Sequence, residues 1–168
     1  MRSIAQLHAD PALMLDAADR ALRRDYPDLY VTAWVGIVDL VSRNLTFASA
    51  GHPPALLARN DGTLTELSDW ALPLGLRVAH QGEATTVALT DGATLVLYTD
   101  GLTEANHDVV AGDALVRAAA ANVAAAPWRD PASAVQRQVL DRACRHSRRP
   151  LRFREKRGAP AAHGLRSP

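Results

Sequence analysis

The clearest chemical signal in this sequence is a carboxylate that follows directly after an apolar segment. Residues 94–98 read Thr-Leu-Val-Leu-Tyr, a run typical of a strand buried on both faces, and Thr99-Asp100-Gly101 comes next. A carboxylate buried at the end of such a strand costs several kcal/mol unless a cation or hydrogen bonds compensate its charge. Mg²⁺ and Mn²⁺ are suitable cations because they prefer oxygen ligands. A metal ion at Asp100 is therefore one interpretation of this segment, and taken alone the signal is weak.

Asp100 and the other reactive side chains also have plain structural interpretations. Asp-Gly is a common turn dipeptide, and taken alone it favours a turn over a metal site. His52 lies in a Gly-His-Pro-Pro loop and is interpreted as a turn residue rather than a catalytic one. Glu104 is a candidate cap for the next helix. Cys144, the only cysteine, lies on a predicted helix face and is interpreted as a packing residue.

A helix is predicted to precede the strands. Asp10-Pro11 predicts its start, because an N-cap carboxylate accepts free backbone N–H groups and proline fits the first helical position. Pro27 predicts its end. The predicted apolar stripe consists of Leu15, Ala18 and Leu22, with Met14 and Ala21 beside them.

The middle of the chain has the pattern of short strands. The predicted strands are residues 31–38, 45–50, 55–59, 63–67, 84–89 and 93–99. Asn60-Asp61-Gly62 and Thr90-Asp91-Gly92 are predicted hairpin turns, because Asn and Gly tolerate positive φ. Short strands joined by tight turns predict an antiparallel meander rather than a parallel α/β sheet.

Helices are predicted again at residues 113–124 and from Pro131 onward, where Val135, Val139 and Ala143 share a face. The predicted fold class is α+β, with a largely antiparallel sheet flanked by helices.

The charge distribution divides the chain at residue 144. Residues 1–144 carry 11 basic and 17 acidic side chains, whereas residues 145–168 carry 8 basic and 1 acidic side chain. Such a break is typical of a tail or linker. We therefore expect one domain over residues 1–144 and a basic tail over 145–168.

Composition restricts the classes of function. No apolar run is long enough for a membrane span, and no signal peptide is evident at the start. The single cysteine fits a reducing compartment, so we expect a cytoplasmic protein without membrane contact. The basic tail has no accompanying nucleic-acid motif, so we expect no nucleic-acid partner.

Several ordered motifs resemble one protein family. Residues 98–105 read YTDGLTEA, which resembles the metal-binding segment of SpoIIE/RsbU-type serine phosphatases in the PPM (PP2C-like) superfamily. Residues 47–57 (FASAGHPPALL) and 72–76 (LPLGL) resemble two further motifs of that family, in the same order. The resemblance covers roughly residues 5–143, and ordered motifs are more specific than any one of them.

The resemblance implies a fold and a reaction. The chain would form part of the PPM β-sandwich flanked by helices, and two Mn²⁺ or Mg²⁺ ions would activate a water that attacks phosphoserine. Asp100 matches a metal-ligating aspartate, and Gly101 would serve backbone geometry beneath the metals. The implied substrate is a phosphorylated regulatory protein, typically an anti-sigma factor antagonist of the STAS type.

The chain departs from the family at both ends. The first metal aspartate of the family lies upstream of every motif present here, and Arg145-His146-Ser147 and the residues after them replace the strand that carries the last one. Activity is therefore expected to be impaired. The alternative is a non-catalytic fragment or pseudophosphatase that only binds a protein. Missing strands would expose sheet edges and favour self-association.

The tail itself permits two interpretations. Residues 145–168 have neither helix nor strand period, which is typical of disorder. With suitable codons, residues 148–156 read one nucleotide later spell an Asp-Asp pair followed by an apolar run, so an out-of-frame product is the second hypothesis.

Overall fold

Six strands form two three-stranded sheets in the computed structural model, which describes residues 10–147 except 69, 78–82, 107 and 127. The strand orders are β1-β2-β5 and β4-β3-β6, and every named pair is antiparallel. The strands are β1 (Ala33–Asp39), β2 (Asn44–Ala50), β3 (Ala55–Ala58), β4 (Leu64–Leu67), β5 (Thr85–Ala88) and β6 (Thr94–Val96).

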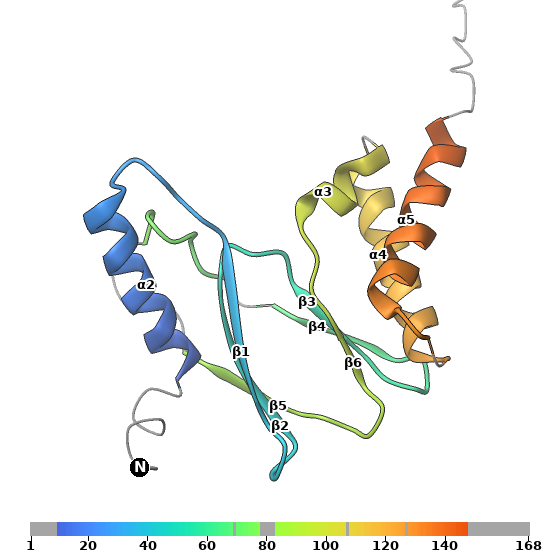
Figure 1. Cartoon of the computed structure of the whole chain (residues 1–168), viewed down its shortest axis with the longest axis horizontal. Coiled ribbons are helices and arrows are strands. Elements are labelled where there is room, and N and C mark those ends of the chain that lie inside the picture. Colours follow the sequence, from blue (N-terminus) through green and yellow to red (C-terminus); the bar gives the residue numbers. More distant parts are fainter. Residues whose placement is uncertain (1–9, 69, 78–82, 107, 127, 148–168) are drawn as a thin grey trace, which may run out of the picture.

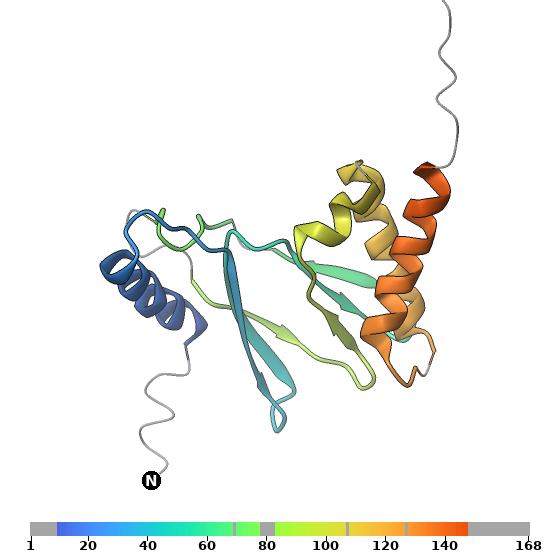
Figure 2. The ribbon, with the colours of Figure 1, turned by 45° about the horizontal axis from the view of Figure 1, so that its top comes forward.

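Helices cover both outer faces of the two sheets (Figures 1 and 2). Helix α2 (Pro11–Asp25) packs on β1 and β2, whereas α4 (Val109–Ala124) packs on β3, β4 and β6 and is covered in turn by α5 (Pro131–Ser147). The short α3 (Asp100–Thr103) and the 3₁₀ turn η1 (Glu104–Asn106) connect β6 to α4. The layers run helix, sheet, sheet, helix, which confirms the predicted α+β class with antiparallel sheets flanked by helices.

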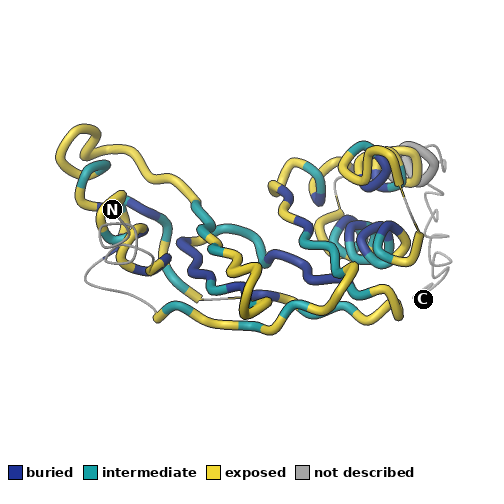
Figure 3. The backbone as a smooth tube through the Cα atoms, turned by 60° about the horizontal axis from the view of Figure 1, so that its bottom comes forward, coloured by how far each residue is buried: buried dark blue, intermediate teal, exposed yellow. Residues whose placement is uncertain are grey.

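Each interface between layers has its own apolar cluster. Leu45, Phe47 and Leu57 lie between the sheets, and Trp34 stacks on Phe47 with ring centroids 5.5 Å apart. A second cluster joins α2 to its sheet, and a third joins α4 and α5 to the other sheet. Figure 3 shows the buried positions along the inner strands and α4, with the segment after α2 exposed.

Helix α2 begins as predicted but presents a different face to the sheet. The Asp10 carboxylate accepts the N–H of Ala12 at 2.8 Å, which confirms the predicted N-cap. The buried positions are Pro11, Ala12, Leu15 and Asp19, whereas Met14 and Ala18 are exposed. The predicted stripe was wrong in this respect because an apolar pattern alone could not identify Asp19 as a buried position.

The two predicted hairpin turns have different outcomes. Residues 60–62 join β3 to β4, and Gly62 has φ +83°, as expected. Residues 90–92 do not form a hairpin, because β5 pairs with β2 while β6 pairs with β3 in the other sheet. The side chain of Asn60 donates to the carbonyl oxygen of Asp91 at 3.2 Å, so this crossing turn packs on the first turn. The antiparallel pairing is confirmed, and the strands divide between two sheets, as expected for part of a β-sandwich, so the meander is interrupted between β5 and β6.

The later helices differ from the prediction mainly at their ends. Helix α4 begins at Val109, earlier than predicted, because the Asp108 carboxylate caps it by accepting the N–H of Ala111 at 3.0 Å. The cap is thus Asp108 and not Glu104. In α5, Val135 and Val139 are buried on one face as predicted. Helix α5 extends to Ser147, and residues 148–168 of the expected tail lie outside the described residues.

In the part of the chain that the structure describes, no helix has the length and apolar character needed to cross a bilayer.

Candidate metal centre

Asp100 lies where the chain leaves β6 and enters α3. Val96 and Tyr98 are buried against α4 and α5, but Leu97 is 46% exposed and Asp100 is also exposed. The prediction of a strand buried on both faces is therefore wrong, because β6 ends at Val96 and the chain beyond it departs from the sheet. Desolvation of the exposed carboxylate therefore does not call for a metal here, and only the residues around Asp100 can indicate one.

The backbone around Asp100 is ordered by local hydrogen bonds. The Asp100 Oδ1 accepts the N–H of Gly101 at 2.8 Å, and the Thr103 hydroxyl donates to the Asp100 carbonyl at 2.9 Å. Gly101 has no positive φ, and a Cβ built there would meet nothing closer than the Thr99 hydroxyl at 3.9 Å. The geometric role expected of Gly101 beneath bound metals stays a prediction.

A cavity of about 350 Å³ brings Asp100 together with residues from the other sheet. Thr32 precedes β1, His52 follows β2, and Asp100 follows β6, so both sheets contribute to its wall. The His52 Nδ1 lies 2.8 Å from the carbonyl oxygen of Pro53. Because a carbonyl only accepts, Nδ1 carries the hydrogen, and in the neutral ring Nε2 is then an acceptor. The arrangement is a polar pocket with one carboxylate.

The donor atoms fit part of a divalent-cation site. Of the described residues that line the cavity, Asp100 alone has a carboxylate, beside the hydroxyls of Thr32 and Thr99 and the His52 ring. No group of three or more His, Cys, Asp or Glu suited to a metal occurs among the described residues. A carboxylate that accepts one N–H retains lone pairs for a cation. The set fits one coordination position, and a two-ion site requires further oxygen ligands.

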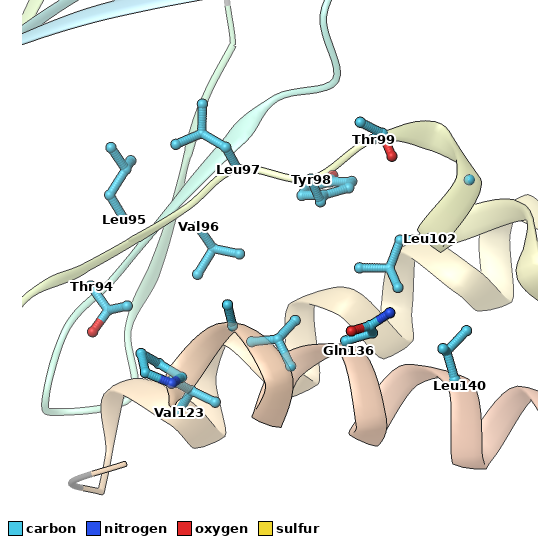
Figure 4. A pocket seen from close by; sticks show the side chains of 14 residues that line it. Thr94, Leu95, Val96, Leu97, Tyr98, Thr99, Leu102, Val123, Gln136 and Leu140 are labelled. Atoms are coloured by element: carbon cyan, nitrogen blue, oxygen red, sulfur yellow. The ribbon is translucent and has the colours of Figure 1, made fainter. Parts of the chain in front are cut away.

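A second, larger cavity is lined by residues of the same segment, from Thr94 to Leu102, together with residues of α4 and α5 (Figure 4). It has a volume of about 660 Å³, and none of the residues that line it carries a charge. Figure 4 shows Val96, Leu102 and Leu140 around it, from β6, α3 and α5. Burial, helped by the Asp113 carboxylate, raises the pKa of Tyr98 above its ordinary value. The lining of this cavity is mainly apolar, and it shares Thr99 with the smaller cavity.

Comparison with known proteins identifies the class to which this fold and site belong. The family model described as Stage II sporulation protein E (SpoIIE) matches residues 1–152. The chain therefore belongs to the SpoIIE family, and the resemblance inferred from residues 47–57, 72–76 and 98–105 is confirmed.

Individual relatives agree with this assignment. The chain is 32% identical over 73 residues to phosphoserine phosphatase RsbP of Bacillus subtilis, which covers 44% of this chain but only 18% of RsbP. The RsbU and RsbW domains of Rv1364c from Mycobacterium tuberculosis match with a TM-score of 0.65 and 28% identity, over 81% of this chain and 38% of that one. This chain thus spans less than half of each of these two relatives.

The fold also matches the phosphatase domain of the cell fate determinant SpoIIE from Bacillus subtilis (Mn presoaked). The TM-score is 0.52 at 16% identity, over 83% of this chain and 60% of that one. At this identity the comparison supports the fold alone.

Sequence reasoning missed part of the cavity wall. Residues 30–33 only fit the family pattern after the first helix, and Thr32 was not predicted as a site residue. His52 was interpreted as a turn residue, and it does bond to the carbonyl of Pro53, but it also lines the cavity with Asp100. The motif at residues 47–57 was the only signal that could have placed His52 near the site.

Proposed function

We propose that this chain is part of a metal-dependent protein serine phosphatase and that Asp100 supplies one ligand of its metal centre. The observation that carries the proposal is the cavity in which Thr32, His52 and Asp100 converge from both sheets. Membership of the SpoIIE family supports it. The substrate class we propose is phosphoserine on a regulatory protein, because RsbP is a phosphoserine phosphatase.

The proposed chemistry assigns limited roles to the described residues. In such enzymes Mn²⁺ or Mg²⁺ supplies an activated water for attack on phosphorus. Asp100 would hold a cation through its carboxylate, while the hydroxyls of Thr32 and Thr99 would offer hydrogen bonds to phosphate oxygens or water. Further carboxylates must join the site before two ions can bind.

A non-catalytic role as a protein-binding module is the second candidate. It is favoured by one observation, the single carboxylate among the described residues that line the cavity. One carboxylate does not compensate the charge of two divalent cations. The two candidate functions differ in one expected result. Only the phosphatase should hydrolyse phosphate esters once the missing metal-ligating aspartates are supplied.

The test joins the chain to family-like segments that carry the first and last metal aspartates. With Mn²⁺, the joined protein should hydrolyse p-nitrophenyl phosphate and a phosphoserine peptide. Asp100→Asn should reduce the rate by at least about 100-fold. Asp91→Asn is the matched control, since Asp91 also lies in a Thr-Asp-Gly tripeptide but pairs with Arg43 at 3.0 Å, and should leave the rate unchanged.

Two results would reject parts of this proposal. A folded, joined protein without turnover would favour the protein-binding role. Full turnover of the Asp100→Asn protein would remove Asp100 from the metal centre.

A further inference from the structure

Residues 73–75, here called the clasp, contact one wall of the candidate metal centre through backbone hydrogen bonds. The N–H of Val31 donates to the carbonyl of Leu74 at 3.0 Å, and the N–H of Leu74 donates to the carbonyl of Val31 at 2.9 Å. Leu74 is buried against α2. Val31 directly precedes Thr32, which lines the cavity. A movement of the clasp would therefore move Thr32.

The clasp also packs on Gly51, which lies next to the start of β1. A Cβ built on Gly51 would lie 2.6 Å from Pro73 Cγ, so the proline ring packs directly on the glycine backbone. Gly51 has φ +69° and precedes His52, and both line the cavity. Gly51 also bridges to Ala33 at the start of β1. The clasp thus contacts both segments of this sheet that line the cavity with Asp100.

Helix α2 holds the clasp through a buried carboxylate. The Asp19 Oδ1 accepts the N–H of Gly75 at 2.7 Å, and Oδ2 pairs with Arg23 Nε at 2.9 Å. Gly75 has φ +91°, and a side chain there would overlap the carbonyl oxygen of Leu29. Figures 1 and 2 show residues 70–77, drawn in green, beside α2. A charge-assisted bond at a partly buried position is among the stronger hydrogen bonds in a protein.

We propose that Asp19 is a positioning residue for the candidate metal centre, acting through the clasp on Thr32 and His52. This positioning role deepens the proposed function and rests on it, because it assumes that the centre binds metal. The effect of Asp19 on the positions of Thr32 and His52 depends only on contacts between described residues. Asp19 is not among the described residues that line the cavity, and it contacts the clasp through its hydrogen bond with Gly75.

The test compares variants of Asp19 by ¹⁵N NMR of the metal-free chain. Asp19→Ala should speed hydrogen exchange at the Gly75 amide by about 10-fold and shift the amide signals of Thr32 and His52. Asp19→Asn should restore both readouts to near the parent, because an amide oxygen still accepts the Gly75 N–H. Arg23→Ala should also leave them near the parent, since it removes only the ion pair on Oδ2.

Two further variants separate positioning from simple loss of stability. Val139→Ala weakens packing in the cluster that joins α4 and α5 to the other sheet, which contains no clasp residue, and should lower stability while leaving the Thr32 and His52 signals in place. Pro73→Ala removes the ring from Gly51, and should shift His52 without affecting exchange at Gly75. If Asp19→Ala fails to fold, Pro73→Ala is the variant that tests whether the clasp positions His52.

The proposal is overturned if Asp19→Ala leaves Thr32 and His52 unshifted, or if Val139→Ala shifts them equally. It is also overturned if Asp19→Ala does not fold and Pro73→Ala leaves His52 unshifted. Because these NMR readouts use no metal, they test the positioning role of Asp19 independently of the proposed phosphatase function. Shifts as expected, together with Mn²⁺ bound away from Asp100, would retain the positioning role and reject the metal centre.

Discussion

Gly112 is the residue at which α4 approaches the turn after Asp100 most closely. It is buried, and a Cβ built there would overlap the carbonyl oxygen of Thr103. Because that oxygen belongs to backbone, the clash cannot be relieved by rotating a side chain. The absence of a side chain at Gly112 therefore sets the distance between α4 and α3.

Gly112→Ala should lower the free energy of unfolding by about 1–3 kcal/mol, as expected for overpacking. Urea denaturation measures this directly. Gly101→Ala adds the same methyl group where the nearest atom is 3.9 Å away, and should change stability far less. Equal effects of the two substitutions would show that the Gly112 contact is not close.

Residue types alone could not distinguish the two Thr-Asp-Gly tripeptides of this chain. Asp91 has an 83% exposed side chain on the crossing turn, whereas Asp100 opens α3 beside His52. Only the surrounding motifs indicated that Asp100 belongs to a site. Thr32 could not be predicted, since its place in the cavity depends on how the two sheets meet.

Among the secondary-structure elements, the end of β6 packs on α4 through Tyr98. It is buried in the cluster formed with α4 and α5, and burial together with Asp113 raises its pKa. Because the folded pKa lies above the unfolded value, the neutral ring contributes stability that is present below the unfolded pKa. That contribution is lost as the pH rises through the folded pKa.

Tyr98→Phe should therefore make stability less dependent on pH in the alkaline range. The measurement is the free energy of unfolding of both proteins from about pH 8 to about pH 11, around the tyrosine pKa. Tyr30→Phe alters an exposed ring and is the control. A parent and a Tyr98→Phe protein with the same alkaline slope would contradict this assignment.

The elements themselves were largely predictable because their signals are local. Asp10 and Asp130 precede the prolines that open α2 and α5, and all six strands were expected near their observed positions. The crossing from β5 to β6 was not predictable from its turn residues. Sheet membership is decided by pairing with β2 and β3, which are distant in sequence. For the same reason the pattern could not show that Asp19 faces inward.

At the scale of the whole molecule, both sheets have open edges among the described strands. Each sheet has three strands, so β1, β5, β4 and β6 are edge strands. Val38 on β1 is 46% exposed, and unpaired edges favour association with another chain.

We expect the chain to self-associate with rising concentration, as measured by sedimentation velocity. Val38→Lys should weaken this association, because a charge on an edge strand opposes pairing. Leu40→Lys, at an exposed turn position, is the control and should have less effect. A single monomer peak at every concentration would contradict the expectation.

The proposed metal centre depends most on Asp100 as a ligand. Mn²⁺ titration of the ¹⁵N-labelled chain measures this directly, because bound Mn²⁺ broadens the signals of nearby amides. We predict that broadening begins at Thr32, His52 and Gly101, disappears in Asp100→Asn and persists in Asp91→Asn. Broadening centred elsewhere, or unchanged in Asp100→Asn, would contradict the assignment.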